Sequence, residues 1–216
     1  MEINSIDRNF WKGKKIFITG HNGFVGSWLC CSLENLNVKK ITGYSLKNKN
    51  KNCLFNKLNF SKKFITSIYG DINNYSKLQK AIDLSKPEIV IHLAAQPIVN
   101  TGYEFPLNTF TTNVIGTANL LNILRYKKNV KSILVITSDK VYKNLEKKTG
   151  YKENDHLGGY DPYSASKAAA EIITESMKLS FFQKNCGIAT TRAGNIIGGG
   201  DWAQNRIIPD IVSSLK

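Results

Sequence analysis

A glycine-rich turn near the start of the chain constrains the possible folds more than any other feature. An apolar run at 14–19 leads into Gly20, Gly23 and Gly26, and apolar residues then recur at helical spacing. Gly20 permits a tight strand-to-helix turn, Gly23 permits a ligand to approach the backbone, and Gly26 permits the helix to pack on the strand. The free N–H groups and the helix dipole favour a pyrophosphate. The spacing is G-x-x-G-x-x-G rather than G-x-G-x-x-G, so a turn without a ligand stays the alternative to a dinucleotide site.

Strand and helix patterns alternate along the rest of the chain. Further strands are expected at 39–44, 64–69, 87–93, 132–136 and 188–191, and further helices at 75–84, 106–127, 161–184 and 207–215. Continuous apolar strands separated by helices are typical of a parallel sheet that is covered on both faces. The predicted fold class is therefore α/β, a doubly wound Rossmann sheet with helices on both faces.

The composition indicates one globular core without a membrane segment. The chain has 216 residues, of which 42% are hydrophobic, so it can bury one sizeable core, and it has no run of 18 apolar residues. Residues 1–8 lack the basic and then apolar pattern of a signal peptide. The cysteines show no metal-ligand spacing, and we interpret them as reduced thiols (Cys30, Cys31, Cys53 and Cys186). We therefore expect a cytoplasmic protein with no metal and no membrane partner.

The net charge of +14 raises the question of a nucleic-acid partner, because a cationic surface attracts polyanions. The lysines are scattered, however, and many stand beside asparagines, as in the low-complexity run 47–52, which is typical of a solvated loop. We expect no nucleic-acid partner. The charge is equally consistent with attraction of a phosphorylated small substrate and with no role.

Five residues that can carry acid–base chemistry lie in two places, the start of one predicted helix and the end of one predicted strand. Tyr163 and Lys167 stand one helical turn apart at the start of the helix expected at 161–184. A free Tyr titrates near ~10, so a Tyr base that works near neutrality needs a pKa about three units lower, or ~4 kcal/mol, and a nearby cation can supply much of that shift. Ser138, Asp139 and Lys140 place a hydroxyl, a carboxylate and an amine at the end of the strand 132–136. The alternatives are an ordinary helix start and a surface ion pair.

Other residues at strand ends are placed to meet a dinucleotide. Asp71 ends the third strand and is expected at the adenine, with a surface N-cap as the alternative. Ala94 and Ala95 end the fourth strand, where small side chains let a flat cofactor lie against the backbone, although core packing would also explain them. We interpret His21 as a loop residue rather than a ligand or base, and His92 as a core histidine with one satisfied nitrogen.

The sequence alone leaves the choice between NAD and NADP open. An acid at the end of the second strand would select NAD by binding the ribose 2′-hydroxyl. The segment 43–46 has no acid there, and Lys47 and Lys49 could tolerate a 2′-phosphate.

Several motifs resemble the extended short-chain dehydrogenase/reductase family. They are Thr19-Gly-x-x-Gly-Phe-x-Gly26, His92-Leu-Ala-Ala-Gln-Pro97, Asn113-Val-Ile-Gly-Thr117, Thr137-Ser-Asp-Lys-Val-Tyr142 and Pro162-Tyr-Ser-x-Ser-Lys167. Within this family the sugar-nucleotide 4,6-dehydratases carry a hydroxyl residue, Asp and Glu at the strand end, whereas this chain has Lys140 in the third position. Asn100 and Gly102 also depart from the family, which usually has a basic residue and a Ser there. The resemblance covers nearly the whole chain.

The resemblance implies a domain division, a cofactor and partners. Residues 1–198 would form the dinucleotide-binding domain, and 199–216 would be the start of a substrate-binding region that is largely missing. NAD would be the cofactor, a nucleotide sugar the substrate, and a homodimer would form through the helices 106–127 and 161–184. The implied cofactor contacts are Gly20, Asn22, Gly23, Phe24, Val25, Gly26, Asp71, Ile72, Leu93, Ala94, Ala95, Gln96, Thr112, Tyr163 and Lys167. The implied substrate contacts are Asn195 and Arg206, the latter with a solvated helix charge as the alternative.

The resemblance also implies a role for each catalytic residue. Tyr163 would remove the sugar 4-hydroxyl proton while hydride passes from C4 to NAD, and Lys167 would hold the ribose and lower the Tyr pKa. Ser138 would donate a hydrogen bond to the oxygen at C4. Lys140 would take or relay the C5 proton, and Asp139 would protonate the departing 6-hydroxyl before hydride returns to C6.

Two other functions stay open at this point. One is a non-catalytic NAD-binding fragment, because a larger C-terminal region is expected. The other is an NAD-dependent nucleotide-sugar 4-epimerase. The Asp139–Lys140 pair argues against an epimerase, which needs no acid for loss of water.

Overall fold

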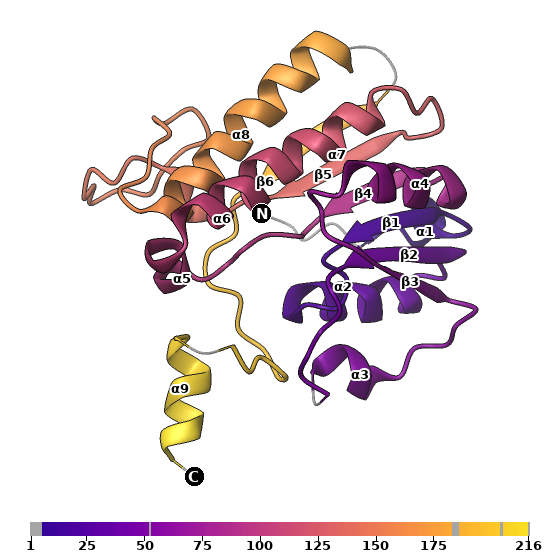
Figure 1. Ribbon diagram of the computed structural model, residues 1–216, viewed down its shortest axis with the longest axis horizontal. Coiled ribbons are helices and arrows are strands. Elements are labelled where there is room, and N and C mark those ends of the chain that lie inside the picture. The colour runs from indigo at the N-terminus through magenta and orange to yellow at the C-terminus, as the bar shows by residue number, and fades with distance from the viewer. Residues whose placement is uncertain (1–5, 52, 183–185, 204, 216) are drawn as a thin grey trace.

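A six-stranded parallel sheet forms the centre of the computed structural model, which describes residues 6–51, 53–182, 186–203 and 205–215 (Figure 1). The strands are β1 (Lys15–Thr19), β2 (Lys40–Ser45), β3 (Ile65–Tyr69), β4 (Ile89–His92), β5 (Ser132–Ile136) and β6 (Gly187–Thr191). Their order is β3-β2-β1-β4-β5-β6, and each neighbouring pair is parallel. The chain reverses its direction of winding between β1 and β4, which is where such sheets open a crevice for ligands. The predicted doubly wound α/β fold is confirmed.

Helices cover both faces of this sheet. They are α1 (Arg8–Trp11), α2 (Phe24–Asn35), α3 (Leu54–Leu58), α4 (Tyr75–Ser85), α5 (Val99–Glu104), α6 (Pro106–Phe110), the π-helix η1 (Thr111–Ile115), α7 (Gly116–Leu124), the 3₁₀ turn η2 (Asp139–Val141), α8 (Pro162–Phe181) and α9 (Ile207–Ser214). Figure 1 shows α7 and α8 on one face and α2 on the other, with α9 away from the sheet at the end of the segment that follows β6.

The strand residues alternate between two apolar cores, as period-2 geometry requires. Phe17 of β1 packs into a core with Leu120 of α7, whereas its neighbours Ile16 and Ile18 pack with Leu33 of α2 on the other face. These side chains are almost fully buried. The two cores fix the sheet between its helices and hold the carboxyl ends of the strands in one row.

The predicted helix 106–127 differs most from the structure. It consists of α6, η1 and α7 in series and ends at Leu124. In η1, Asn113 donates from Nδ2 to Ser166 Oγ of α8 at 2.8 Å and to Gln96 O at 3.1 Å, and its Oδ1 accepts from Gln96 N at 2.8 Å. The π turn therefore carries an amide that ties the end of β4 to α8.

Smaller differences concern short helices and helix ends. The sequence patterns miss α1, α3 and α5, which are too short to show a periodic apolar face. The helix expected to reach Lys184 ends at Phe181, and Lys184 itself lies outside the described residues. In the described part of the chain, no helix is long and apolar enough to cross a bilayer.

Candidate active site

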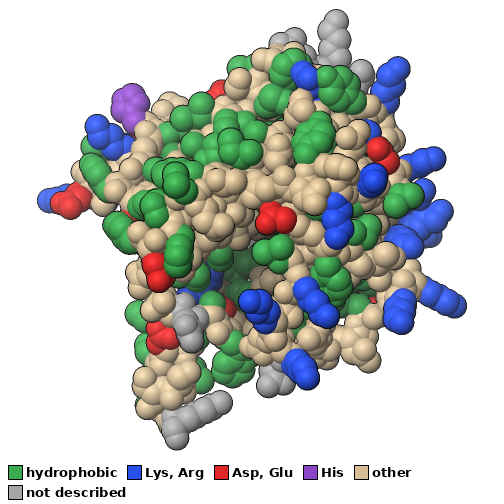
Figure 2. Space-filling model, viewed as in Figure 1, with side chains coloured by type: hydrophobic (Ala, Val, Ile, Leu, Met, Phe, Trp, Pro, Cys, Tyr) green, Lys and Arg blue, Asp and Glu red, His purple; other side chains and the backbone are tan. Residues whose placement is uncertain are grey.

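A cavity of about 990 Å³ opens at the carboxyl ends of β1, β4 and β5. Its walls come from the glycine turn, the segments that follow β4 and β5, the start of α8, and the segment between β6 and α9. Figure 2 shows a hollow on this side of the molecule, with Lys and Arg side chains gathered on the side that carries β2, β3 and α3. The cavity therefore lies at the switch point of the sheet, as the strand order predicts.

The glycine turn has the geometry that the sequence predicts, with one correction. Gly20 has φ +74°, and a Cβ there would lie 2.8 Å from Ala94 N, so the turn is closed against the end of β4. A Cβ on Gly26 would lie 2.3 Å from Gly20 O. Gly26 thus permits α2 to pack on the turn itself rather than on the strand. Both positions require glycine, and the backbone of the turn faces the cavity.

Lys167 reaches the end of β5 from α8. Its Nζ donates to Ile136 O at 3.1 Å, and the residue is only 8% exposed. Burial lowers the pKa of Lys167 to about 8. The ammonium therefore stands beside the cavity in a poorly hydrated position, one turn along α8 from Tyr163.

The pKa of Tyr163 corrects the expectation drawn from the sequence. Burial raises this pKa, and it outweighs the hydrogen bond with Ser138 and the positive charge of Arg206, which both lower it. The structure thus assigns the favourable effects on the phenolate to Ser138 and Arg206, and the expected lowering by Lys167 is not seen.

The carboxylate and the amine of the strand end are exposed to the cavity. Ser138 caps η2, since its Oγ accepts from Lys140 N at 3.2 Å, and the same oxygen lies 3.1 Å from Asp139 Oδ1. Asp139 N donates to Ala193 O at 3.0 Å, which fixes the turn against the segment after β6. Both side chains can therefore meet a substrate in the cavity.

The cavity brings together most of the residues that the sequence singles out. They are Gly20, Phe24, Val25, Gly26, Leu93, Ala95, Ser138, Asp139, Lys140, Tyr163, Lys167, Asn195 and Arg206. Arg206 also forms an ion pair with Asp201, with 3.4 Å between Nη1 and Oδ2, so it is not a free helix charge. The catalytic and substrate roles of these residues stay predictions.

The other candidates lie outside the walls of this cavity. They are Asn22, Gly23, Asp71, Ile72, Ala94, Gln96 and Thr112. Asn22 donates from Nδ2 to Leu46 O at 2.8 Å. Asp71 is exposed and accepts from Asn73 N at 2.8 Å. Ile72 is buried in the core. Asn74, rather than Asp71, caps α4. Their predicted contacts with a cofactor also stay predictions.

A buried polar chain beneath the site was not expected from the sequence. Thr19 Oγ1 accepts from two backbone N–H groups that follow β4, so its own hydrogen goes to His92 Nδ1 at 2.6 Å. Thr117 Oγ1 donates to Asn113 O at 2.7 Å, so it accepts from His92 Nε2 at 3.0 Å. Both nitrogens of His92 are therefore satisfied, where the sequence predicts one. Burial, with a smaller effect from the charge of Lys167, lowers the pKa of His92 to about 3.

His21 is likewise more buried than a loop histidine. Its Nε2 lies 2.8 Å from Ser67 Oγ, and its ring packs edge-on against Phe55. Burial lowers the pKa of His21 to about 4. A Cβ on Gly43 would lie 2.2 Å from this ring, so the histidine fills the space above β2.

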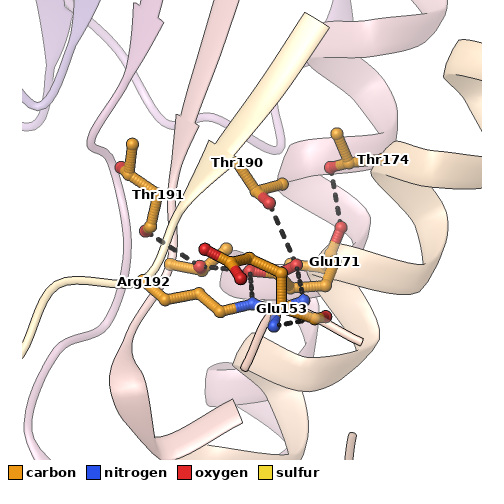
Figure 3. Close-up of polar contacts among 8 residues, drawn as sticks. Glu153, Glu171, Thr174, Thr190, Thr191 and Arg192 are labelled. Atoms are coloured by element: carbon orange, nitrogen blue, oxygen red, sulfur yellow. Dashed lines mark hydrogen bonds and ion pairs between the residues drawn. The ribbon is translucent and has the colours of Figure 1, made fainter. Parts of the chain in front are cut away.

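A second network joins α8 to the ends of β5 and β6 (Figure 3). Glu171 accepts from Thr137 Oγ1 at 2.5 Å, from Thr190 Oγ1 at 3.0 Å, and from Arg192 through Nε at 3.1 Å and Nη2 at 2.9 Å. Arg192 also donates to Glu153 O at 2.9 Å. The partners of Glu171 are distant in the sequence, so no local pattern predicts this network. The sequence shows only that Glu171 stands one helical turn after Lys167.

The segment after β6 closes the cavity on the side of α2. Trp28 Nε1 donates to Gly199 O at 3.0 Å, and Lys57 of α3 lies 5.8 Å from the centre of the Trp202 ring. The segment therefore spans from β6 back to α2 and α3, and it carries Asn195 and Arg206 along one wall of the cavity.

The fold and site define a Rossmann-type dinucleotide-binding protein with a Tyr–Lys pair at the switch point. A profile of the GDP-mannose 4,6-dehydratase family matches residues 17–204, and the chain belongs to this family. The motif resemblance to sugar-nucleotide 4,6-dehydratases of the extended short-chain dehydrogenase/reductases is thereby confirmed.

Individual relatives agree with this assignment. The chain is 46% identical to the CDP-glucose 4,6-dehydratase of Salmonella typhimurium over 98% of its own length and 60% of the relative's. It is 32% identical to the dTDP-D-glucose 4,6-dehydratase of Dictyostelium discoideum over 94% of its own length and 48% of the relative's. The chain thus spans about half to three-fifths of the length of these two relatives.

Solved structures show the same fold. A DesIV double mutant, a dTDP-glucose 4,6-dehydratase from Streptomyces venezuelae with NAD and DAU bound, has a TM-score of 0.82 at 21% identity over 93% of this chain and 61% of its own. The dTDP-glucose 4,6-dehydratase of Bacillus anthracis in complex with NAD has a TM-score of 0.77 at 25% identity over 93% of this chain and 60% of its own.

Proposed function

We propose that this chain carries the cofactor-binding part and the catalytic residues of an NAD-dependent CDP-glucose 4,6-dehydratase. This lyase would convert CDP-glucose to CDP-4-dehydro-6-deoxyglucose and water. The observation that carries the proposal is that Ser138, Asp139, Lys140, Tyr163 and Lys167 line one cavity in a chain 46% identical to a CDP-glucose 4,6-dehydratase. The segment 199–216 would begin the substrate-binding region.

The strand end favours CDP-glucose over other nucleotide sugars. The Asp139–Lys140 pair, where other sugar-nucleotide dehydratases have Asp and Glu, resembles the CDP-glucose type. The segments 10–14, 43–46, 157–162 and 199–202 resemble that type as well. An epimerase has no need of this acid–amine pair, because it removes no water.

The residues of the cavity fit NAD. The backbone of the glycine turn lines the cavity at Gly20 and Gly26, where no side chain fits because a Cβ would clash with neighbouring backbone atoms, and small Ala95 follows β4. These residues would hold the dinucleotide, with Lys167 at the ribose. Bound NAD would supply the hydride acceptor for C4 of the sugar and, once reduced, the hydride donor for C6.

The side chains divide the proton transfers between them. Tyr163 would take the 4-hydroxyl proton, helped by Ser138 and Arg206, which already act to lower its pKa. A ketone at C4 makes the C5 proton acidic, and Lys140 would take or relay it. Asp139, exposed to the cavity beside Lys140, would protonate the 6-hydroxyl so that it leaves as water.

Two measurements on purified protein test this proposal. Denaturation should release NAD, because the cycle restores the cofactor and has no need to exchange it. Release of NADP would contradict the cofactor assignment. So would a protein that releases no nucleotide and does not bind added NAD. Incubation with CDP-glucose should give the 4-keto-6-deoxy product in an NMR spectrum. Bound NAD with no absorbance change on addition of CDP-glucose would instead support the non-catalytic NAD-binding fragment.

We also propose a cytoplasmic homodimer that forms through α6, η1, α7 and α8. Apolar side chains on the outer faces of these helices are exposed, among them Leu107, Ile115 and Ile172. Ala168 and Ala170 of α8 are buried and pack inside the protomer. A monomer in light scattering at micromolar concentration would contradict the dimer.

A further inference from the structure

Two oppositely charged side chains of α8 reach consecutive residues at the end of β5. Lys167 donates from Nζ to Ile136 O, and Glu171, one turn later, accepts from Thr137 Oγ1. Lys167 is 8% exposed and Glu171 is 5% exposed. A buried ammonium and a buried carboxylate at i and i+4 of one helix are expected to form an ion pair.

The structure holds Glu171 in a different pair. Arg192 binds both carboxylate oxygens through Nε and Nη2, and Thr137 and Thr190 supply further hydrogen bonds. Burial alone would raise the pKa of Glu171, but these hydrogen bonds and the charge of Arg192 lower it, so the carboxylate stays ionised. The planar guanidinium is itself fixed, because it donates to Glu153 O and lies 4.7 Å from the centre of the Tyr142 ring.

The other titratable groups around Lys167 do not replace this carboxylate. His92 of β4 is neutral at pH 7 because its pKa is lowered. Tyr163 of α8 is neutral as well because its pKa is raised. Asp139 shares the cavity with Lys167 but is exposed to solvent. Glu171 is thus the buried carboxylate on the same helix face that Lys167 would take as its partner.

We propose that Arg192 is a positioning residue for Lys167: by holding Glu171 in a bidentate pair at the ends of β5 and β6, it keeps the Lys167 ammonium on the Ile136 carbonyl and available to the cofactor. This inference rests on the proposed function for the role of Lys167 at the ribose. Without Arg192, the Glu171 carboxylate would be a buried charge without its strongest partner. It would turn to Lys167 and withdraw the ammonium from the cavity.

The test is an NMR titration of Lys167 in protein labelled with [ε-¹³C]lysine, with the signal assigned through Lys167→Met. In Arg192→Met, the pKa of Lys167 should rise by about one to three units, the range expected for an opposite charge within ~4–6 Å. In Arg192→Met/Glu171→Gln the rise should disappear, because the competing carboxylate is gone. A Lys167 pKa that is the same in Arg192→Met as in the unchanged chain would overturn the proposal.

The double variant separates positioning from simple loss of structure. NAD affinity should fall roughly tenfold in Arg192→Met, the equivalent of one pKa unit of interaction energy, and should recover in the double variant. Equal loss of affinity in both variants would show that Arg192 acts only on the fold and would overturn the proposal. If Arg192→Met does not fold, Arg192→Lys should give a smaller rise of the same sign, since it keeps the charge but loses the bidentate geometry. None of these readouts needs turnover, so a chain that does not convert CDP-glucose fails the proposed function and leaves this test intact.

Discussion

Acid should destabilise this protein through His92, and the size of the effect follows from its surroundings. The folded-state pKa of His92 is lowered from 6.5 to about 3. Between these two values the unfolded chain binds a proton that the folded chain excludes, so stability falls as the pH falls. From pH 7.5 to 4.5, the loss amounts to about 3 kcal/mol, because the free energy changes by ~1.4 kcal/mol for each pH unit below 6.5.

His21 should add a similar loss, since its pKa is lowered to about 4. Together the two histidines would remove about 5 kcal/mol by pH 4.5, which is comparable to the whole stability of many domains. A variant that removes one of them should therefore lose only about half as much on acidification.

The assay is urea unfolding, followed by circular dichroism at pH 7.5, 6.0 and 4.5, for the unchanged chain and for His92→Gln. The glutamine keeps one donor and one acceptor but cannot titrate. It should lower stability at pH 7.5, yet its loss between pH 7.5 and 4.5 should be about 3 kcal/mol smaller than that of the unchanged chain. His156→Gln serves as the control, because His156 is exposed and should follow the unchanged chain. Parallel pH dependence of His92→Gln and the unchanged chain would refute the argument from burial.

Three further predictions concern the site. Gly26→Ala should lower the melting temperature and weaken NAD binding in a calorimetric titration, because the new Cβ would lie 2.3 Å from Gly20 O. The control Gly150→Ala should change neither, because the space around Gly150 is open. Tyr163→Phe, assayed with CDP-glucose in a form of the protein that turns over, should give no absorbance of enzyme-bound NADH, since the base is gone; formation of NADH would contradict its role. Asp139→Asn should still oxidise C4 but lose water roughly 10²–10⁴-fold more slowly, so that the 4-keto sugar nucleotide with its 6-hydroxyl accumulates; loss of water at the parent rate would remove Asp139 from the mechanism and favour an epimerase.

The elements that the sequence predicts well are those with local causes. The apolar runs of the six strands and the glycine turn depend on neighbouring residues, so the parallel sheet and the turn at Gly20 could both be inferred. The meeting of Tyr163 with Ser138 could also be inferred, because Ser138 follows β5 and the next long helix, which carries Tyr163 in its first turn, begins at the same edge of the sheet.

What could not be predicted depends on partners far away in the chain. His92 forms two hydrogen bonds, one with Thr19 and one with Thr117, and these partners are 73 and 25 residues away in the chain. The direction of the Tyr163 pKa shift depends on how deeply the ring is buried, which no motif encodes. The network of Glu171 and Arg192 joins a helix to two strand ends, and its members look like ordinary surface charges in the sequence.

The π turn η1 has a consequence for insertions and deletions. A π turn usually accommodates one residue more than an α-helix of the same course. Deletion of one residue within 111–115 would therefore leave a regular helix, with Leu120 and Leu124 still facing the sheet. It would remove the hydrogen bonds that the Asn113 amide forms with Gln96 and Ser166. The same deletion inside α7 would rotate every later side chain by about 100° and turn those leucines out of the core. When this chain is aligned with relatives, a gap of one residue in this helix belongs at η1.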